Sequence, residues 1–160
     1  MIRPLRFWPD PILLTPTRSW DFVNSDLDHS ELETDMFDTL QHHRALGLAA
    51  NQIGLPLRVF VMHSQTNSEY RVFYNPEILS QDSEIVDSGE GCLSFPKTIL
   101  KISRPKFIQA QWQNSNGEIC QGQFVDIDAR CFCHELEHLN GQVFKDHVSD
   151  LKFRKAYKKS

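Results

Sequence analysis

The segment His134-Glu135-Leu136-Glu137-His138 constrains the fold more than any other part of this sequence. An α-helix has about 3.6 residues per turn, so residues four positions apart lie side by side on one face. On such a helix His134 and His138 can bind one divalent metal together, and Glu135 can take a proton from water without ligating the metal. The motif lacks a third ligand, and the nature of that ligand decides the function.

The surrounding segment is predicted to be a buried helix that runs from Asp126 or Asp128 to Asn140 and ends at a left-handed Gly141. Apolar side chains occupy both of its sides, and a helix of this kind packs between other elements. Buried histidines and a buried glutamate require partners. A chance occurrence of the motif on a solvated helix is therefore the weaker interpretation.

Elsewhere the chain shows the patterns of antiparallel strands and of one further helix. The alternation at 106–113 predicts a strand, and Asn116-Gly117 supplies the turn to the next one. Near the N-terminus, Ser30 and Glu33 form a predicted capping box. The predicted helices are 30–44 and 126–140, and the predicted strands are 58–63, 71–75, 106–113 and 118–125. We expect one α+β domain over residues 1–160, with antiparallel sheets packed around a central buried metal-binding helix and with an N-terminal helix.

Composition and charge narrow the functional classes. The 160 residues are 40% hydrophobic and 24% charged, with no apolar run long enough to cross a bilayer and no secretory signal. The four cysteines are therefore expected to be reduced or to bind metal. The net charge of −4 argues against direct binding of nucleic acid. From the lack of a secretory signal and of a long apolar run, we expect a cytoplasmic protein that does not bind membranes directly. An organelle or the host cell of a virus fits the sequence as well.

The end of the chain carries a cluster of basic residues, Lys152, Arg154, Lys155, Lys158 and Lys159. Such a cluster is most often a solvated helix end. The second interpretation is a transient contact with an acidic surface such as the ribosome.

No residue after the metal-binding helix is a convincing third ligand. One protease class would have a histidine at position 144, where Phe144 stands, and another would use a downstream glutamate, but none follows His138. Asp146, His147 and Asp150 come after the end of the helix and are interpreted as surface residues.

The upstream candidate is Cys92, because a thiolate is a strong ligand for soft or borderline metals. Cys131, on the histidine face of the helix, is a weaker ligand candidate or a wall of the pocket. Most free cysteines are small buried hydrophobic residues. That is the competing interpretation of Cys92 and the simplest one for Cys120, Cys131 and Cys133.

Three segments in this order resemble the signatures of the peptide deformylase family: Gly47-Leu48-Ala49-Ala50-Asn51-Gln52, Glu90-Gly91-Cys92-Leu93-Ser94 and His134-Glu135-Leu136-Glu137-His138. The segment Pro9-Asp10-Pro11-Ile12-Leu13 also resembles the usual start of the family, so the resemblance extends over nearly the whole chain. It implies a hydrolase that removes the formyl group from the N-terminal formylmethionine of nascent peptides.

The chain departs from the family pattern at several positions. Ala45 replaces a glycine, Cys133 a glutamine and Glu137 an aspartate, which leaves the expected ligands and base intact. Ile99 replaces a residue that is often basic, and Arg130 one that is often apolar or small. These last two changes concern contacts with the substrate rather than the chemistry.

By the same resemblance, Cys92, His134 and His138 bind one metal per chain and leave the fourth position to a water molecule. Fe²⁺ is the expected ion, with Zn²⁺, Ni²⁺ or Co²⁺ as substitutes, although the ligand set alone favours zinc. Glu135 is expected to be the general base, which takes a proton from water and passes it to the departing amine.

The resemblance also assigns the groups that contact the substrate. The Gln52 side chain and the Leu93 backbone N–H are expected to stabilise the developing oxyanion. The N-formylmethionyl peptide is expected to bind a monomer as an extended strand along Leu46, Gly47 and Gly91. Its methionine side chain would enter an apolar pocket walled by Cys131.

Two alternatives stay open at the level of sequence. A metallopeptidase that cleaves internal amide bonds would need a downstream third ligand, which the chain lacks. A deformylase-like binding module would have lost a ligand or the base, and neither is lost here. Metal content measured together with formate release would distinguish the three functions.

Overall fold

The computed structural model describes residues 1–157, so Lys158 and Lys159 of the basic cluster lie outside the described residues. The α-helices of this part are α1 (His29–His42), α2 (Asp126–Leu139) and α3 (Asp150–Ala156), and the short 3₁₀ helices are η1 (Pro11–Leu14), η2 (Ala50–Ile53) and η3 (Phe144–His147). The strands are β1 (Gly47–Ala49), β2 (Val59–His63), β3 (Tyr70–Gln81), β4 (Ile85–Cys92), β5 (Phe95–Pro105), β6 (Phe107–Gln113) and β7 (Ile119–Val125). None of the helices within residues 1–157 has the length and apolar character that a membrane span needs.

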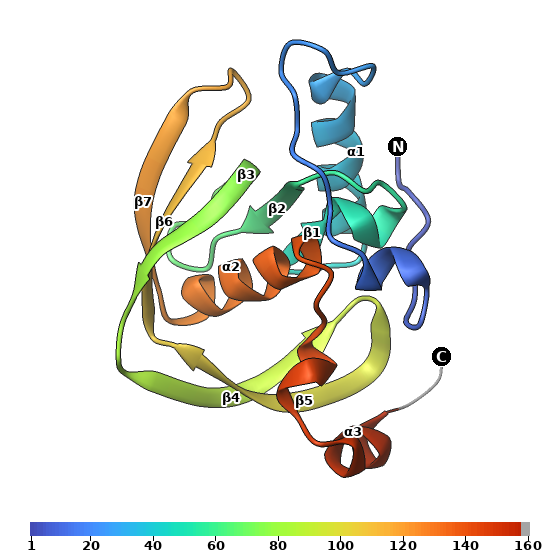
Figure 1. Cartoon of the computed structure of the whole chain (residues 1–160), viewed down its shortest axis with the longest axis vertical. Helices are drawn as coiled ribbons and strands as arrows, with labels where there is room; N and C mark the ends of the chain where they lie inside the picture. The colour runs from blue at the N-terminus through green and yellow to red at the C-terminus, as the bar shows by residue number, and fades with distance from the viewer. Residues whose placement is uncertain (158–160) are drawn as a thin grey trace.

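The strands form two antiparallel sheets, and α2 lies between them (Figure 1). The larger sheet has the order β1-β2-β3-β6-β7, and the smaller one is the β4–β5 ribbon. Helix α2 contacts β1, β2, β6 and β7 of the larger sheet and β5 of the ribbon. The predicted architecture, antiparallel sheets around a central buried helix with an N-terminal helix α1, is confirmed.

Strand β2 belongs to two hydrophobic cores at once. Successive side chains of a strand point to opposite faces. Phe60 and Met62 therefore pack in the core that includes α2, while Val59 and Val61 pack in the core that includes α1. A strand that is buried on both faces has a continuous apolar sequence, as this one does.

An aromatic cluster fixes the orientation of α2. Phe132 of α2 has ring centroids 5.0 Å from Phe60, 5.2 Å from Phe73 and 4.9 Å from Phe124, all on the larger sheet. Each such ring pair contributes about 0.5–1.5 kcal/mol beyond its buried area. With this face of α2 held against the larger sheet, the opposite face is directed toward β4.

Helix α1 begins and ends differently from the prediction. The Asp28 side chain caps it by accepting hydrogen bonds from the backbone of Ser30 and Glu31, so the predicted Ser30–Glu33 capping box is wrong. Glu33 instead accepts a hydrogen bond of 2.7 Å from the Tyr74 hydroxyl. The helix ends at His42 because Arg44 has a φ of 52°, outside helical geometry.

The predicted β6–β7 hairpin is confirmed, with Gly117 in its turn at a φ of 78°. Strand β3 continues well beyond the predicted 71–75, to Gln81. Strands β4 and β5 were not predicted. The buried face of β5 mixes polar with apolar residues, namely Phe95, Thr98, Leu100, Ile102 and Arg104, and this hides its alternation.

Candidate metal centre

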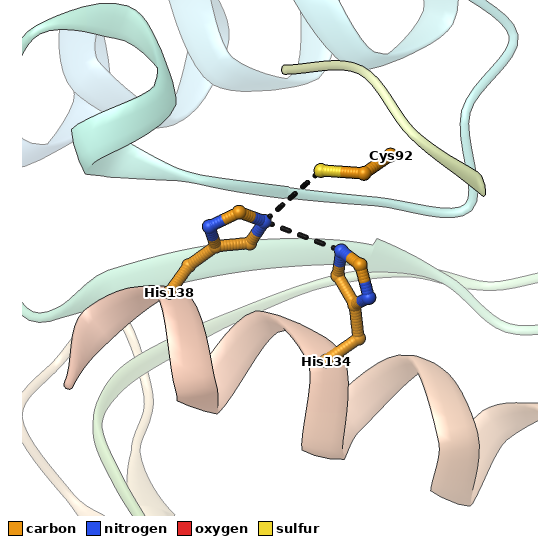
Figure 2. Close-up of side chains that lie close together, drawn as sticks. All are labelled: Cys92, His134 and His138. Atoms are coloured by element: carbon orange, nitrogen blue, oxygen red, sulfur yellow. Dashed lines mark hydrogen bonds between the residues drawn. The ribbon is translucent and has the colours of Figure 1, made fainter. Parts of the chain in front are cut away.

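Two side chains of α2 and one of β4 converge at one place (Figure 2). His134 and His138 project from successive turns of α2, and Cys92 is the last residue of β4. The Nε2 atom of His138 lies 3.2 Å from Nε2 of His134 and 3.3 Å from Sγ of Cys92. Ligand atoms of the three residues all lie within 4.8 Å of one another.

These separations suit a single metal ion. Nitrogen ligands at about 2.0 Å and a sulfur ligand at about 2.3 Å, placed tetrahedrally, lie roughly 3.3–3.6 Å apart. The observed 3.2 and 3.3 Å are close to that range. A thiolate with two imidazoles is also a donor set that borderline divalent metals bind. Cys92, His134 and His138 therefore fit one divalent metal.

The other ligand candidates lie outside this group. Among the described residues, the cluster does not include Asp146, His147 or Asp150, as the sequence indicated. Cys131 is not part of it either, and lies against Gly47 instead.

Glu90 supports the metal centre from the side of His134, a role that sequence reasoning missed. Its Oε1 lies 2.7 Å from His134 Nδ1, and its carboxylate accepts hydrogen bonds from Arg104 (2.8 and 3.0 Å) and Arg130 (2.8 Å). Burial raises the pKa of Glu90, but the hydrogen bonds from Arg104 and His134 outweigh it and hold the pKa well below its usual range. The ionised carboxylate keeps a proton on His134 Nδ1, which leaves Nε2 as the ligand atom.

Arg104 extends this network to Glu137 and His147. Arg104 is only 3% exposed, and its guanidinium also donates to Glu137. Glu137 Oε2 lies 2.6 Å from His147 Nε2, so His147 is a member of the network rather than a free surface residue. The ion pairs join β4, β5, α2 and η3. A buried charge network of this kind is stable only when each member is satisfied.

Burial also sets the charge states of the histidines. Burial lowers the pKa of His138 well below its usual value, and the neighbouring His134 lowers it further. Burial lowers the pKa of His134 too, but Cys92 and Glu90 outweigh this and raise it. Protons shared among such groups are released when a metal binds, because the metal takes their place.

Glu135 is buried next to the cluster without being a ligand. Its side chain is 4% exposed, and Oε2 has no hydrogen-bond partner within residues 1–157. Burial raises the pKa of Glu135 to about 7. A carboxylate with a pKa near neutrality is well suited to accept a proton from water and return it.

The 3₁₀ helix η2, which follows β1, places an amide beside the cluster. Gln52 is 2% exposed, and its Oε1 accepts a hydrogen bond from the Ala49 backbone at 2.9 Å. Its Nε2 lies 3.1 Å from Ser94 Oγ and 3.6 Å from Cys92 Sγ. Leu93 occupies the turn between β4 and β5, directly after Cys92. Both predicted oxyanion donors therefore border the metal centre.

A cavity of about 570 Å³ opens onto the centre. Its lining includes every predicted site residue except His138, namely Leu46, Gly47, Gln52, Gly91, Cys92, Leu93, Cys131, His134 and Glu135. Gly47 is in very close contact with α2, since a Cβ atom there would lie 2.7 Å from Glu135 Oε1 and 2.8 Å from Cys131 Sγ. The structure thus brings the three sequence motifs to one site.

Comparisons with known proteins agree with this geometry. The family model described as polypeptide deformylase matches residues 2–154. The peptide deformylase of Bartonella henselae is 38% identical over 154 residues, covering 94% of this chain and 86% of the relative.

Solved structures give the same result. The crystal structure of peptide deformylase from Thermotoga maritima matches with a TM-score of 0.86 and 34% identity, over 93% of this chain and 99% of that one. The Ehrlichia chaffeensis enzyme, solved in complex with actinonin, matches with a TM-score of 0.89 and 32% identity, over 97% and 93% of the two chains. With three ordered motifs gathered around one metal centre, this chain belongs to the peptide deformylase family.

Proposed function

We propose that this chain hydrolyses the N-formyl group of N-formylmethionyl nascent peptides and releases formate, with Cys92, His134 and His138 holding one divalent metal. The observation that carries this proposal is the convergence of the three ligand atoms within 4.8 Å, beside a buried carboxylate and an open cavity. When bound, the metal supplies Lewis-acid chemistry, polarising the formyl oxygen and making water more acidic.

Glu135 is the group that moves the proton in this proposal. Its carboxylate takes a proton from the attacking water, and the protonated acid then gives that proton to the amine that leaves the formyl carbon. Burial holds the pKa of Glu135 at about 7, so both transfers are accessible near neutral pH. The buried Oε2 without a partner leaves an acceptor free for this role.

Gln52 and Leu93 hold the formyl oxygen as negative charge develops on it. Gln52 Nε2 is a donor fixed beside Cys92 by the hydrogen bond that Gln52 Oε1 accepts from Ala49. The Leu93 backbone N–H comes from the turn next to Cys92. Donors that are already in place stabilise an oxyanion because they need no reorganisation during the reaction.

The peptide binds along the free edge of β1 in this proposal. Strand β1 pairs only with β2 within the larger sheet, so its other edge can accept an added strand. Leu46, Gly47 and Gly91 line the cavity beside that edge, and Cys131 forms part of the wall of the methionine pocket.

We further propose Fe²⁺ as the native ion, with Zn²⁺, Ni²⁺ or Co²⁺ as substitutes, in a cytoplasmic monomer. A transient ribosome contact through the basic residues at the C-terminus is a separate proposal. Replacing Lys152, Arg154, Lys155, Lys158 and Lys159 by glutamine, which keeps the buried Phe153, should then reduce co-sedimentation with ribosomes. Unchanged co-sedimentation would rule out the ribosome contact.

The central experiment measures metal content and formate release together on protein prepared without oxygen. We expect about one metal ion per chain and release of formate from a formyl-Met peptide, with no cleavage of internal amide bonds in an unstructured protein. Glu135→Gln should keep the metal and lose turnover by about two orders of magnitude or more. Native turnover in Glu135→Gln would remove Glu135 from the role of base.

A further inference from the structure

We propose that the rim of the cavity selects substrates by charge, with Arg44 and Lys97 favouring formylated peptides that carry an acidic residue at the second or third position. The inference rests on the proposed function, because it concerns the part of the peptide that follows formylmethionine.

Arg44 and Lys97 are the exposed charged residues in the cavity lining. The carboxylates of the same lining belong to Glu90 and Glu135, which are only 7% and 4% exposed. Neither Arg44 nor Lys97 has a carboxylate oxygen within 4.0 Å in the part of the chain that the structure describes. The rim of the cavity is therefore positively charged and free to meet an acidic side chain.

Other basic residues of the lining do not add to this rim. Arg130 donates to the Glu90 carboxylate and to the backbone oxygens of Ile102 (2.9 Å) and Val86 (2.6 Å). Burial lowers the pKa of His43, and the nearby His42 lowers it further, so His43 is uncharged near neutral pH. The available charge comes from Arg44 and Lys97 alone among the lining residues.

The path of the peptide brings its later residues to this rim. Gln52, which follows β1, borders the metal centre, so a peptide with its formyl group there must extend toward the residues that precede β1. Arg44 precedes Gly47 by three positions, in the turn that joins α1 to β1. Lys97 belongs to β5, so one cation comes from the side of each sheet.

The expected preference is moderate because both side chains are exposed. An exposed ion pair changes affinity by up to about fivefold, and a like-charge contact has a similar effect of opposite sign. A peptide with glutamate at the second or third position should therefore exceed its lysine counterpart in kcat/KM by roughly tenfold at low salt. Salt should reduce the ratio. The difference should lie in KM, because the rim does not touch the reacting group.

The test uses metal-loaded enzyme and two pairs of C-terminally amidated peptides. The first pair is formyl-Met-Ala-Glu-Ala and formyl-Met-Ala-Lys-Ala, which differ at the third position. The second pair carries glutamate or lysine at the second position instead. Formate release is measured at low and high salt for the native enzyme and for the double variant Arg44→Glu with Lys97→Glu. Lys101→Glu is the matched control, since Lys101 is exposed on β5 but outside this cavity. The double variant should prefer lysine peptides, while Lys101→Glu should keep the native preference.

A glutamate-to-lysine ratio near one for both pairs at low salt, or a ratio that Lys101→Glu changes as much as the double variant does, would overturn the inference. Binding of the same peptides to Glu135→Gln, measured by calorimetry, gives an independent readout. If no peptide releases formate, the proposed function fails, and the binding ratio still decides whether the rim selects by charge. Arg44→Gln with Lys97→Gln replaces the double variant if that protein does not fold.

Discussion

At the scale of single residues, Glu90 is the side chain on which the metal centre most depends besides the ligands. Its carboxylate binds His134, Arg104 and Arg130 at once. Glu90→Gln keeps the shape but leaves two arginines short of negative charge, so the free energy of unfolding should fall by about 3–5 kcal/mol. Affinity for the metal should fall by roughly 10- to 100-fold, because His134 loses its carboxylate partner. Urea unfolding and metal content after dialysis against a chelator measure the two effects.

Asp87→Asn is the matched control for Glu90→Gln. Asp87 lies on the same strand, but it is exposed and binds the Ser103 hydroxyl instead of a charged group. Its replacement should change stability by less than about 0.5 kcal/mol. If Glu90→Gln retained metal as tightly as Asp87→Asn, Glu90 would have no role in positioning His134.

Gly47 tests how closely β1 must approach the proposed base. A Cβ atom at this position would lie 2.7 Å from Glu135 Oε1 and 2.8 Å from Cys131 Sγ, so Gly47→Ala must displace both side chains or move β1 away from them. We expect kcat/KM for a formyl-Met peptide to fall by about 100-fold, since a shift of about 1 Å in a reacting group has this effect. The metal content should stay at the native value. Both are measured on the same preparation.

Gly89→Ala provides the comparison for Gly47→Ala. An added Cβ at Gly89 meets only Ile99 Cγ2 at 3.3 Å, and the Ile99 side chain is exposed and free to move. Its effect on kcat/KM should stay below about threefold. If Gly47→Ala and Gly89→Ala lost kcat/KM equally, the close contact between Gly47 and Glu135 would not be the reason for the loss.

A residue of the candidate site could be predicted when it lies within a short sequence motif. Cys92 follows Gly91, and Gln52 ends the segment Gly47–Gln52, and both segments resemble signatures of the family; both residues border the centre. Glu90 was part of such a segment, yet its partners Arg104 and His134 are 14 and 44 positions away. Pairings over such distances depend on the packing of β5 and α2 and have no signature in the sequence.

At the scale of elements, the first turn of α2 is held to the loop after β2. The Asp128 carboxylate accepts hydrogen bonds from Ser64 Oγ at 2.6 Å and the Gln65 backbone at 2.8 Å. Burial raises the pKa of Asp128, but these hydrogen bonds outweigh it and lower the pKa below its usual value. Asp128→Asn should reduce the free energy of unfolding at pH 7 by about 1–3 kcal/mol.

The same carboxylate gives this effect a defined dependence on pH. A group whose pKa is lowered by folding stabilises the protein above its unfolded pKa, about 3.9, and loses this contribution as the pH falls through its folded pKa. The gap in unfolding free energy between native protein and Asp128→Asn should therefore shrink between pH 7 and about pH 3. Asp126→Asn, an exposed change in the same turn, should show little difference at either pH. If the difference in unfolding free energy between native protein and Asp128→Asn did not change with pH, the hydrogen bonds to the ionised Asp128 carboxylate would not be its cause.

Helices and strands could be predicted from the sequence where the residues of one face of the element are all apolar. Strands β6 and β7 and helix α2 meet this condition, and their predicted bounds agree with the structure within one or two residues. Strand β5 does not, because Thr98 and Arg104 occupy its buried face. The predicted N-cap of α1 is wrong because Asp28 and Ser30 are both good caps, and the Glu33 carboxylate that a capping box would use binds the Tyr74 hydroxyl instead.

At the scale of the whole molecule, the metal centre lies where the β4–β5 ribbon meets α2. Cys92 belongs to the β4–β5 ribbon, whereas α2 is held by aromatic contacts to the larger sheet. Asn51 of η2 adds a hydrogen bond of 2.6 Å to the backbone oxygen of His138. A metal on Cys92, His134 and His138 would therefore strengthen the connection that Glu90 and Arg104 already make between the ribbon and α2, and would stabilise the folded protein.

Removal of the metal should then loosen the ribbon before the larger sheet. At a free metal concentration about 100 times Kd, binding stabilises the folded state by roughly 2.7 kcal/mol, so Tm should fall by about 5–10 °C after chelation. Amide hydrogen exchange should rise most in β4 and β5, while the β6–β7 hairpin, held by Trp112 and Phe124 in the aromatic core, should change little. Equal increases in both regions would mean that the metal stabilises the fold without linking the two sheets, and an unchanged Tm would mean that the three residues bind no metal in the folded protein.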